Sequence, residues 1–143
     1  LFTNSLAQGG LYEFCKRGLF DAHLQRVRGE YRERRDAMVA ALRRYVPAAS
    51  FDVPHGGLFV WLKLPDKTDA RRLLEEAIDL HLGFITGPLF YAEPGGHNRI
   101  RLSFACHPPE AIADGMRRLG LALQRALPTE RKTEGTSVPR FVV

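Results

Sequence analysis

A short segment late in the chain, residues 99–110 with the sequence RIRLSFACHPPE, holds the residue whose type and place most suggest chemistry. Apolar and polar side chains alternate there, which predicts a strand with one buried face. Arg101 stands at the centre of the polar set. A guanidinium presents a planar fork of N–H donors that matches a carboxylate. Two interpretations stay open: Arg101 faces water from a one-sided sheet, or it binds the carboxylate of a ligand.

The sequence favours no metal centre and no nucleophile. His97, Cys106 and His107 lie near one another, but their spacing matches no common zinc pattern. We therefore expect two surface histidines and one small core residue. The motif GxSxG is absent, and neither Cys15 nor Cys106 has a base nearby in the sequence. Cys15 is expected to pack within a helix.

Paired carboxylates and glycine-rich segments also point to no site. Glu75 and Glu76 are adjacent, so they project from different parts of a helix surface and form a poor acid–base pair. Glycine pairs occur in PHGGLF (54–59) and EPGGHN (93–98), but neither connects a strand to a following helix as a dinucleotide-binding loop does. Both are predicted turns. The sequence thus predicts no catalytic, cofactor-binding or metal-binding residue in this chain.

Length and composition indicate a folded domain cut from a longer protein. The chain has 143 residues, of which 45% are hydrophobic, and it begins with Leu1. No apolar run approaches the roughly 18 residues of a membrane helix, and no signal-peptide pattern is present. Two well-separated cysteines form no disulfide framework. We expect a cytoplasmic protein with no membrane partner.

The net charge of +5 comes with seventeen arginines and four lysines, which makes an anionic partner worth considering. The densest basic run, QRVRGEYRERRD (25–36), is interleaved with Glu30, Glu33 and Asp36. A solvated helix face with internal ion pairs explains this run better than a nucleic-acid surface does. Nucleic acid is therefore not an expected partner.

The first third of the chain reads as two helices. The pattern predicts a helix over 4–17, capped by Asn4 or Ser5 and ended by Gly18. A longer helix over 21–46 would begin at Asp21. Its narrow apolar stripe is interrupted at Arg34 and Arg35. A helix of this length with so narrow a stripe commonly bridges two bodies.

After residue 46 the pattern alternates between strands and helices. Strands are predicted over 50–53, 58–65, 83–86 and 99–104, with helices that begin at Thr68 or Asp69 and at Pro108 or Pro109. This order predicts an α/β (α+β) layer, a small mixed β-sheet covered by helices, over 47–127. The polar segment 128–143 is expected to be a mobile tail that docks through Phe141.

The order of these motifs resembles the C-terminal part of class I/II aminotransferases, which are fold-type-I pyridoxal-phosphate enzymes. The similarity is greatest to the branch that contains 2-aminoadipate-type and broad-specificity aminotransferases. It covers residues 4–127, and the motifs in order are YEFCKRGLFDAHLQRVRGEYRERRDAMVAALRRYVP, PHGGLFVWLKLP, ARRLLEEA, GFITGPLF, NRIRLSFA and PPEAIADGMRRLGLAL. The resemblance implies three parts: helices over 1–46 that lead to a large domain, the small domain over 47–127 and a tail over 128–143.

The resemblance also implies a role for Arg101. In this family, an arginine directly before the sequence LSF binds the α-carboxylate of the amino-acid substrate. Gly87 and Phe90 match a loop that lies near the substrate in the family. Thr86 stands where the family usually has proline, so the identity of the substrate is left open.

The remaining machinery of the family belongs to a large domain outside this chain. That domain carries the Schiff-base lysine, the aspartate at the ring nitrogen, the stacking aromatic residue and the main phosphate loop. Only Lys132, three residues after Thr129, has the spacing of the lysine motif, and it lies in the tail. The resemblance thus implies that pyridoxal 5'-phosphate is bound mainly elsewhere and that the isolated chain is inactive. It also implies an amino acid and a 2-oxo acid as substrates, and a homodimer.

Two other functions remain open. The chain could be the aminotransferase-like effector domain of a bacterial transcription regulator, which a basic winged helix upstream would favour. It could also be a free-standing binding module that reuses the fold, which a start codon just before Leu1 would favour.

Overall fold

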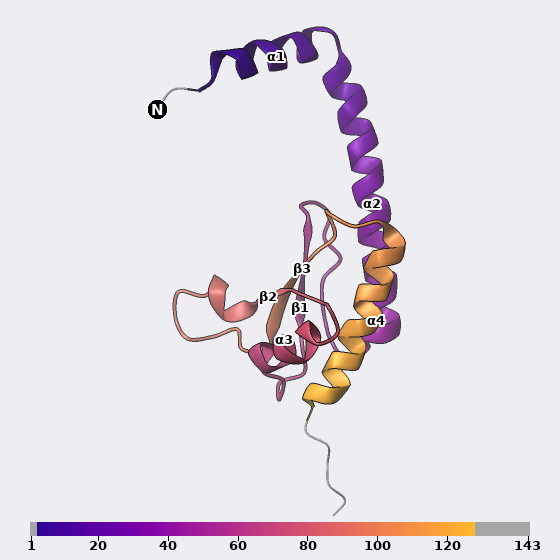
Figure 1. The fold of residues 1–143 in the computed structure, drawn as a ribbon, viewed down its shortest axis with the longest axis vertical. Helices are drawn as coiled ribbons and strands as arrows, with labels where there is room; N and C mark the ends of the chain where they lie inside the picture. The colour runs from indigo at the N-terminus through magenta and orange to yellow at the C-terminus, as the bar shows by residue number, and fades with distance from the viewer. Residues whose placement is uncertain (1–2, 128–143) are drawn as a thin grey trace, which may run out of the picture.

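The computed structural model describes residues 3–127 and shows a small α/β body with a long helical stem (Figure 1). The body contains the sheet, α3, α4 and the C-terminal half of α2, and the rest of α2 projects from it and leads to α1. The elements in chain order are α1 (Ser5–Lys16), α2 (Leu19–Tyr45), β1 (Phe59–Lys63), α3 (Ala70–Ile78), β2 (Ile85–Thr86), the 3-10 helix η1 (Gly87–Phe90), β3 (Arg99–Ser103) and α4 (Pro109–Ala126).

The stem follows the predicted caps, with one correction. The Asn4 side chain accepts hydrogen bonds from the amides of Leu6 and Ala7, at 3.0 and 3.1 Å, and so caps α1. Gly18 has a φ of 71°, a left-handed conformation that ends α1 and lets the chain re-enter a helix at once. The helix α2 therefore begins at Leu19, and Asp21, predicted to be its cap, lies in its first turn. A carboxylate is favourable there, near the positive end of the helix dipole.

The sheet has three strands in the order β1-β3-β2, and both neighbouring pairs are antiparallel. The expectation of a mixed sheet is thus wrong in this detail for the described residues, because the loop after η1 returns the chain beside β2 in the opposite direction. The strand predicted over 50–53 is reduced to one bridge between Ser50 and Lys63. Beyond Ser50, residues 51–53 make no backbone hydrogen bond to β1, so the segment runs beside the sheet without joining it.

The core lies between one face of the sheet and the helices, as the alternation predicted. Figure 1 shows α2 and α4 running along the same side of the sheet. The predicted face of α4 is buried, and the core is completed by single faces of β1, β3, α2 and α3: Ile112, Met116, Leu119, Leu123, Val60, Leu62, Ile100, Leu102, Met38, Leu42, Leu73 and Ala77. The fold class, a small sheet covered by helices, is confirmed.

Two arginines that interrupt the stripe of α2 attach this helix to the ends of the strands. Arg34 donates to the carbonyl of Ala105, just after β3. Arg35 donates to the carbonyl of Pro54, before β1, at 3.3 Å. Their side chains are only 25% and 22% exposed. The interruption of the apolar stripe therefore has a structural cause.

The division into 1–46, 47–127 and 128–143 stays a prediction, and the tail with Phe141 lies outside the described residues. None of the helices within residues 3–127 has both the length and the apolar composition needed to cross a membrane.

Candidate functional site

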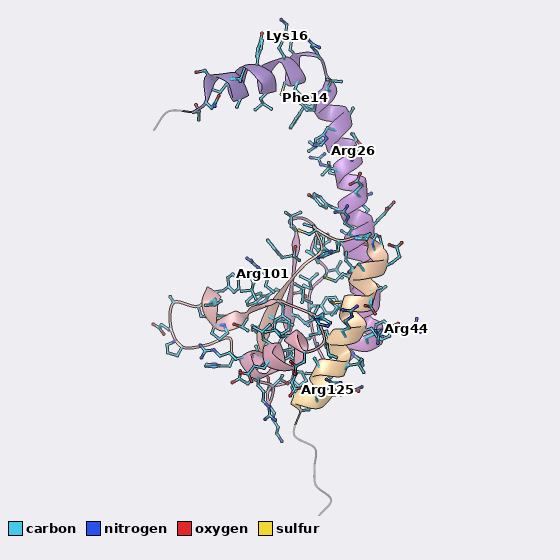
Figure 2. The ribbon with its side chains drawn as sticks, in the orientation of Figure 1. Phe14, Lys16, Arg26, Arg44, Arg101 and Arg125 are labelled. Carbon is cyan, nitrogen blue, oxygen red and sulfur yellow. The ribbon has the colours of Figure 1, made fainter. Side chains whose placement is uncertain are left out.

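Arg101 occupies the middle of the central strand. Its backbone pairs with Trp61 of β1 on one side and with Ile85 of β2 on the other. Its neighbours Ile100 and Leu102 are buried against the helices, so the alternation of the strand directs Arg101 to the opposite face. Figure 2 shows Arg101 on the side of the sheet away from α2 and α4.

Two phenyl rings contact the guanidinium of Arg101. Its Cζ atom lies 4.1 Å from the centroid of the Phe59 ring and 4.7 Å from that of the Phe90 ring. Both distances are well within the range of a cation–π interaction. The Phe90 ring in turn meets Trp61 at 5.3 Å between centroids with an interplanar angle of 89°, the edge-to-face arrangement that aromatic pairs prefer. The guanidinium is thus part of an aromatic group on the open face.

The N–H donors of Arg101 have no acceptor in residues 3–127. No hydrogen bond or ion pair of its side chain occurs in this part of the chain, although the residue is half-buried. Arg34, Arg35, Arg117 and Arg118, by contrast, each donate to a carbonyl or carboxylate. Arg101 is therefore equipped to receive an external anion.

A cavity of about 350 Å³ opens beside Arg101. Its other lining residues are Phe59, Gly83, Phe84, Ile85, Ser103, Cys106 and His107. The lining combines an apolar wall with one permanent cation. It suits a small carboxylate that carries an organic side chain.

The turn that carries Phe90 is positioned by a close backbone approach. A Cβ atom at Gly87 would lie 2.3 Å from the carbonyl oxygen of Gly96 and 2.8 Å from that of Arg99. Only glycine allows η1 to pack so closely against the start of β3. Thr86, which directly precedes this turn, is 7% exposed.

The other sequence candidates do not join this site as a group. Arg99 is on the same face as Arg101 but lines a separate hollow of about 400 Å³, together with Lys63 and Asp52. His97 precedes β3 and His107 follows it, so the strand separates them. Among residues 3–127, no group of three or more His, Cys, Asp or Glu side chains could hold a metal ion.

The two cysteines are both free and exposed, which corrects two expectations. Cys15 does not pack, because no residue of α1 is buried. Cys106 is not a core residue, because it follows the end of β3 and lies in the loop that leads to α4.

Sequence reasoning singled out Arg101 as a candidate but did not predict its contacts. Phe59 was predicted only as part of the strand over 58–65, and Phe90 only as a match to a loop of the resembled family. The usable signal was the placement of large aromatic residues where alternation puts them on the solvent side of a sheet.

Comparison with known proteins finds relatives both in sequence and in structure. The chain is 43% identical over 128 residues to the 2-aminoadipate transaminase of Thermus thermophilus, which covers 89% of this chain and 32% of that protein. The crystal structure of the α-aminoadipate aminotransferase of T. thermophilus, complexed with N-(5'-phosphopyridoxyl)-L-leucine, matches with a TM-score of 0.76 and 42% identity over 81% of this chain and 30% of that one. No family model matches the chain.

A regulator is also among the relatives. An uncharacterised HTH-type transcriptional regulator of Escherichia coli is 31% identical over 129 residues, which is 89% of this chain and 27% of that protein. The chain spans about a third of the length of the aminotransferases it matches among the curated relatives.

Proposed function

Because the chain belongs to the class I/II aminotransferases of fold type I and matches their C-terminal part, we propose that it supplies part of the substrate site of a pyridoxal-phosphate aminotransferase. The whole protein would transfer an amino group between an amino acid and a 2-oxo acid. In this proposal, Arg101 binds the α-carboxylate of the amino-acid substrate.

One observation carries the proposal: Arg101 presents a guanidinium without an acceptor in residues 3–127, on the open face of the sheet and beside a cavity. A guanidinium can bind a carboxylate through two parallel hydrogen bonds, which fixes the orientation of the bound molecule. Holding a substrate in one orientation lowers the entropic part of a reaction barrier. The role of Arg101 is therefore to anchor and orient.

The residues around Arg101 do not fit the cofactor itself. The cavity beside Arg101 has no lysine in its lining, and its only permanent cation is the one assigned to the substrate. Lys63 pairs with Asp66 at 3.4 Å. Pyridoxal phosphate supplies an electron sink where it is bound. In our proposal other parts of the protein hold it, and the assembly is a homodimer.

The anion-binding role can be tested on the 143-residue chain, because Cys106 lines the same cavity as Arg101. The Cys106 thiolate displaces iodide from both iodoacetate and iodoacetamide, but only iodoacetate carries a carboxylate. The ratio of the two rates cancels differences in thiolate fraction and accessibility. We expect a ratio at Cys106 roughly 3- to 10-fold above that at Cys15, which a charge at short range in a high effective dielectric would give.

Arg101→Ala should remove this excess, and Arg99→Ala is the matched control. Both arginines lie on the same face of β3, but Arg99 lines the other hollow. Peptide mapping separates the modified Cys106 from Cys15, which is exposed on α1. An unchanged ratio in Arg101→Ala would show that Arg101 does not attract carboxylates.

The similarity to an HTH-type regulator supports a second candidate, an effector domain. Arg101 would then bind the carboxylate of an effector rather than of a substrate. The two candidates differ in the full-length protein: a regulator would retain a specific DNA fragment in a gel-shift assay and lack amino-group turnover, and an aminotransferase would do the reverse.

A further inference from the structure

We propose that Phe59 and Phe90 are positioning residues that hold the Arg101 guanidinium ready for a carboxylate. We call these two rings the aromatic clamp. The inference rests on the proposed function, since it explains how an anion-binding arginine is kept in place on an open sheet face.

The side chain of Arg101 needs a partner that holds it in one orientation. An arginine side chain has many rotamers, and an unrestrained one must be ordered when its ligand binds. No acceptor in residues 3–127 restrains its guanidinium, whereas both clamp rings contact it, at 4.1 and 4.7 Å from Cζ to centroid. The rings are therefore the described groups that can restrain it.

The two rings leave the N–H donors of the guanidinium free. Cation–π contact uses the negatively charged face of a ring, and the N–H bonds of a guanidinium lie in its own plane. Contact with a ring does not consume a hydrogen-bond donor. The clamp can thus fix the guanidinium and still leave its fork available for two hydrogen bonds to a carboxylate.

The two rings come from different elements of the fold. Phe59 is the first residue of β1, and Phe90 is the last residue of η1. Phe90 is further held by the edge contact with Trp61. The clamp therefore joins a rigid strand to the turn supported at Gly87, and the orientation of Arg101 depends on both.

Both rings of the clamp are partly exposed to solvent. Phe59 is 41% exposed and Phe90 is 45% exposed. Rings this open contribute less to the core than buried rings do, so their loss should disturb the fold little. Their cation–π and aromatic contacts are with the guanidinium and, for Phe90, with Trp61.

The test compares Phe59→Leu, Phe90→Leu and the double variant with the parent chain, using the ratio of iodoacetate to iodoacetamide rates at Cys106. Leucine keeps an apolar side chain but has no π face. We expect each single variant to lower the ratio about two- to five-fold and the double variant to approach Arg101→Ala. Phe59→Tyr and Phe90→Tyr keep the ring and should keep the ratio.

The matched control is Leu89→Ala, which changes a 76% exposed apolar side chain on the same turn as Phe90. It should leave the ratio unchanged, and the iodoacetamide rate alone reports any change in access to Cys106. If the leucine variants keep the parent ratio while Arg101→Ala loses it, the clamp is wrong and the carboxylate role stands. If Arg101→Ala also keeps the ratio, the carboxylate role is wrong and the clamp falls with it.

Discussion

The groups around Arg101 distinguish it from other arginines of this chain. Arg101 is half-buried, contacts two phenyl rings and has no acceptor in the described part of the chain. Other arginines of this protein, such as Arg34 and Arg35, donate to backbone carbonyls and connect elements of the fold. Arg101 therefore differs from the structural arginines in having no acceptor within residues 3–127.

In the full-length protein, Arg101→Ala should selectively weaken reactions of amines that carry an α-carboxylate. Loss of one member of a desolvated, hydrogen-bonded charge pair costs about 2–5 kcal/mol. At about 1.4 kcal/mol per decade, kcat/KM should fall roughly 30-fold to a few thousand-fold. Arg101→Lys should recover only part of this loss, because an ammonium lacks the planar fork.

Steady-state kinetics with an amino acid and with the matching amine without the carboxylate measure this selectivity. Arg99→Ala provides the matched control, because it removes the same charge from the same face of β3. Equal losses for both amines in Arg101→Ala would contradict the anchoring role and leave a structural arginine.

At the scale of elements, the site depends on how η1 is seated on β3. Phe90 reaches Arg101 only because the turn packs against the backbone of Gly96 and Arg99. The strand β2 has only two residues, so hydrogen bonding contributes little to the position of this segment. Close packing at Gly87 compensates for the short strand.

Gly87→Ala should therefore destabilise the domain and displace Phe90. The added methyl group must move backbone atoms, and overpacking of this kind costs about 1–3 kcal/mol. Urea unfolding measures the free energy, and Gly83→Ala is the matched control, because a Cβ there meets no atom within 4 Å. An equal stability of the two variants would show that the turn shifts without cost.

At the scale of the whole molecule, the helical stem differs from the body in how few of its side chains are buried. No residue of α1 is buried, and the buried residues of α2 all lie in its last turns, from Met38 to Leu42. Large apolar side chains remain exposed along the stem: Leu6, Leu11, Tyr12, Leu19 and Phe20. An apolar surface of this kind is typical of a segment that packs against another domain or chain.

We expect the 143-residue chain to self-associate through this stem. The combined substitution Leu11→Glu and Tyr12→Glu should shift it toward the monomer, because burying a carboxylate in an apolar contact is costly. Sedimentation velocity over a range of concentrations measures the change. Gln8→Glu adds a charge to the same exposed helix and serves as the control. A parent chain that stays monomeric at high concentration would contradict the prediction.

The sequence alone determined the elements that rest on local chemistry. The cap at Asn4, the buried face of α4 and the alternation in β1 and β3 were all predicted correctly, because caps and periodicity depend on neighbouring residues. The strand over 50–53 and the start of α2 were not. The start of α2 depends on the left-handed conformation of Gly18, and the pairing of 50–53 depends on how this segment lies beside β1.

Only the tertiary structure decided which distant residues meet. Phe59, Phe90 and Arg101 come from three elements, and no local period relates them. The contact of Arg34 with Ala105 joins residues 71 positions apart. Such contacts follow from the register of the strands and from the packing of helices on one face, which many weak interactions set together. The sequence could therefore indicate Arg101 as a candidate, but the rings that contact it became visible only in the folded chain.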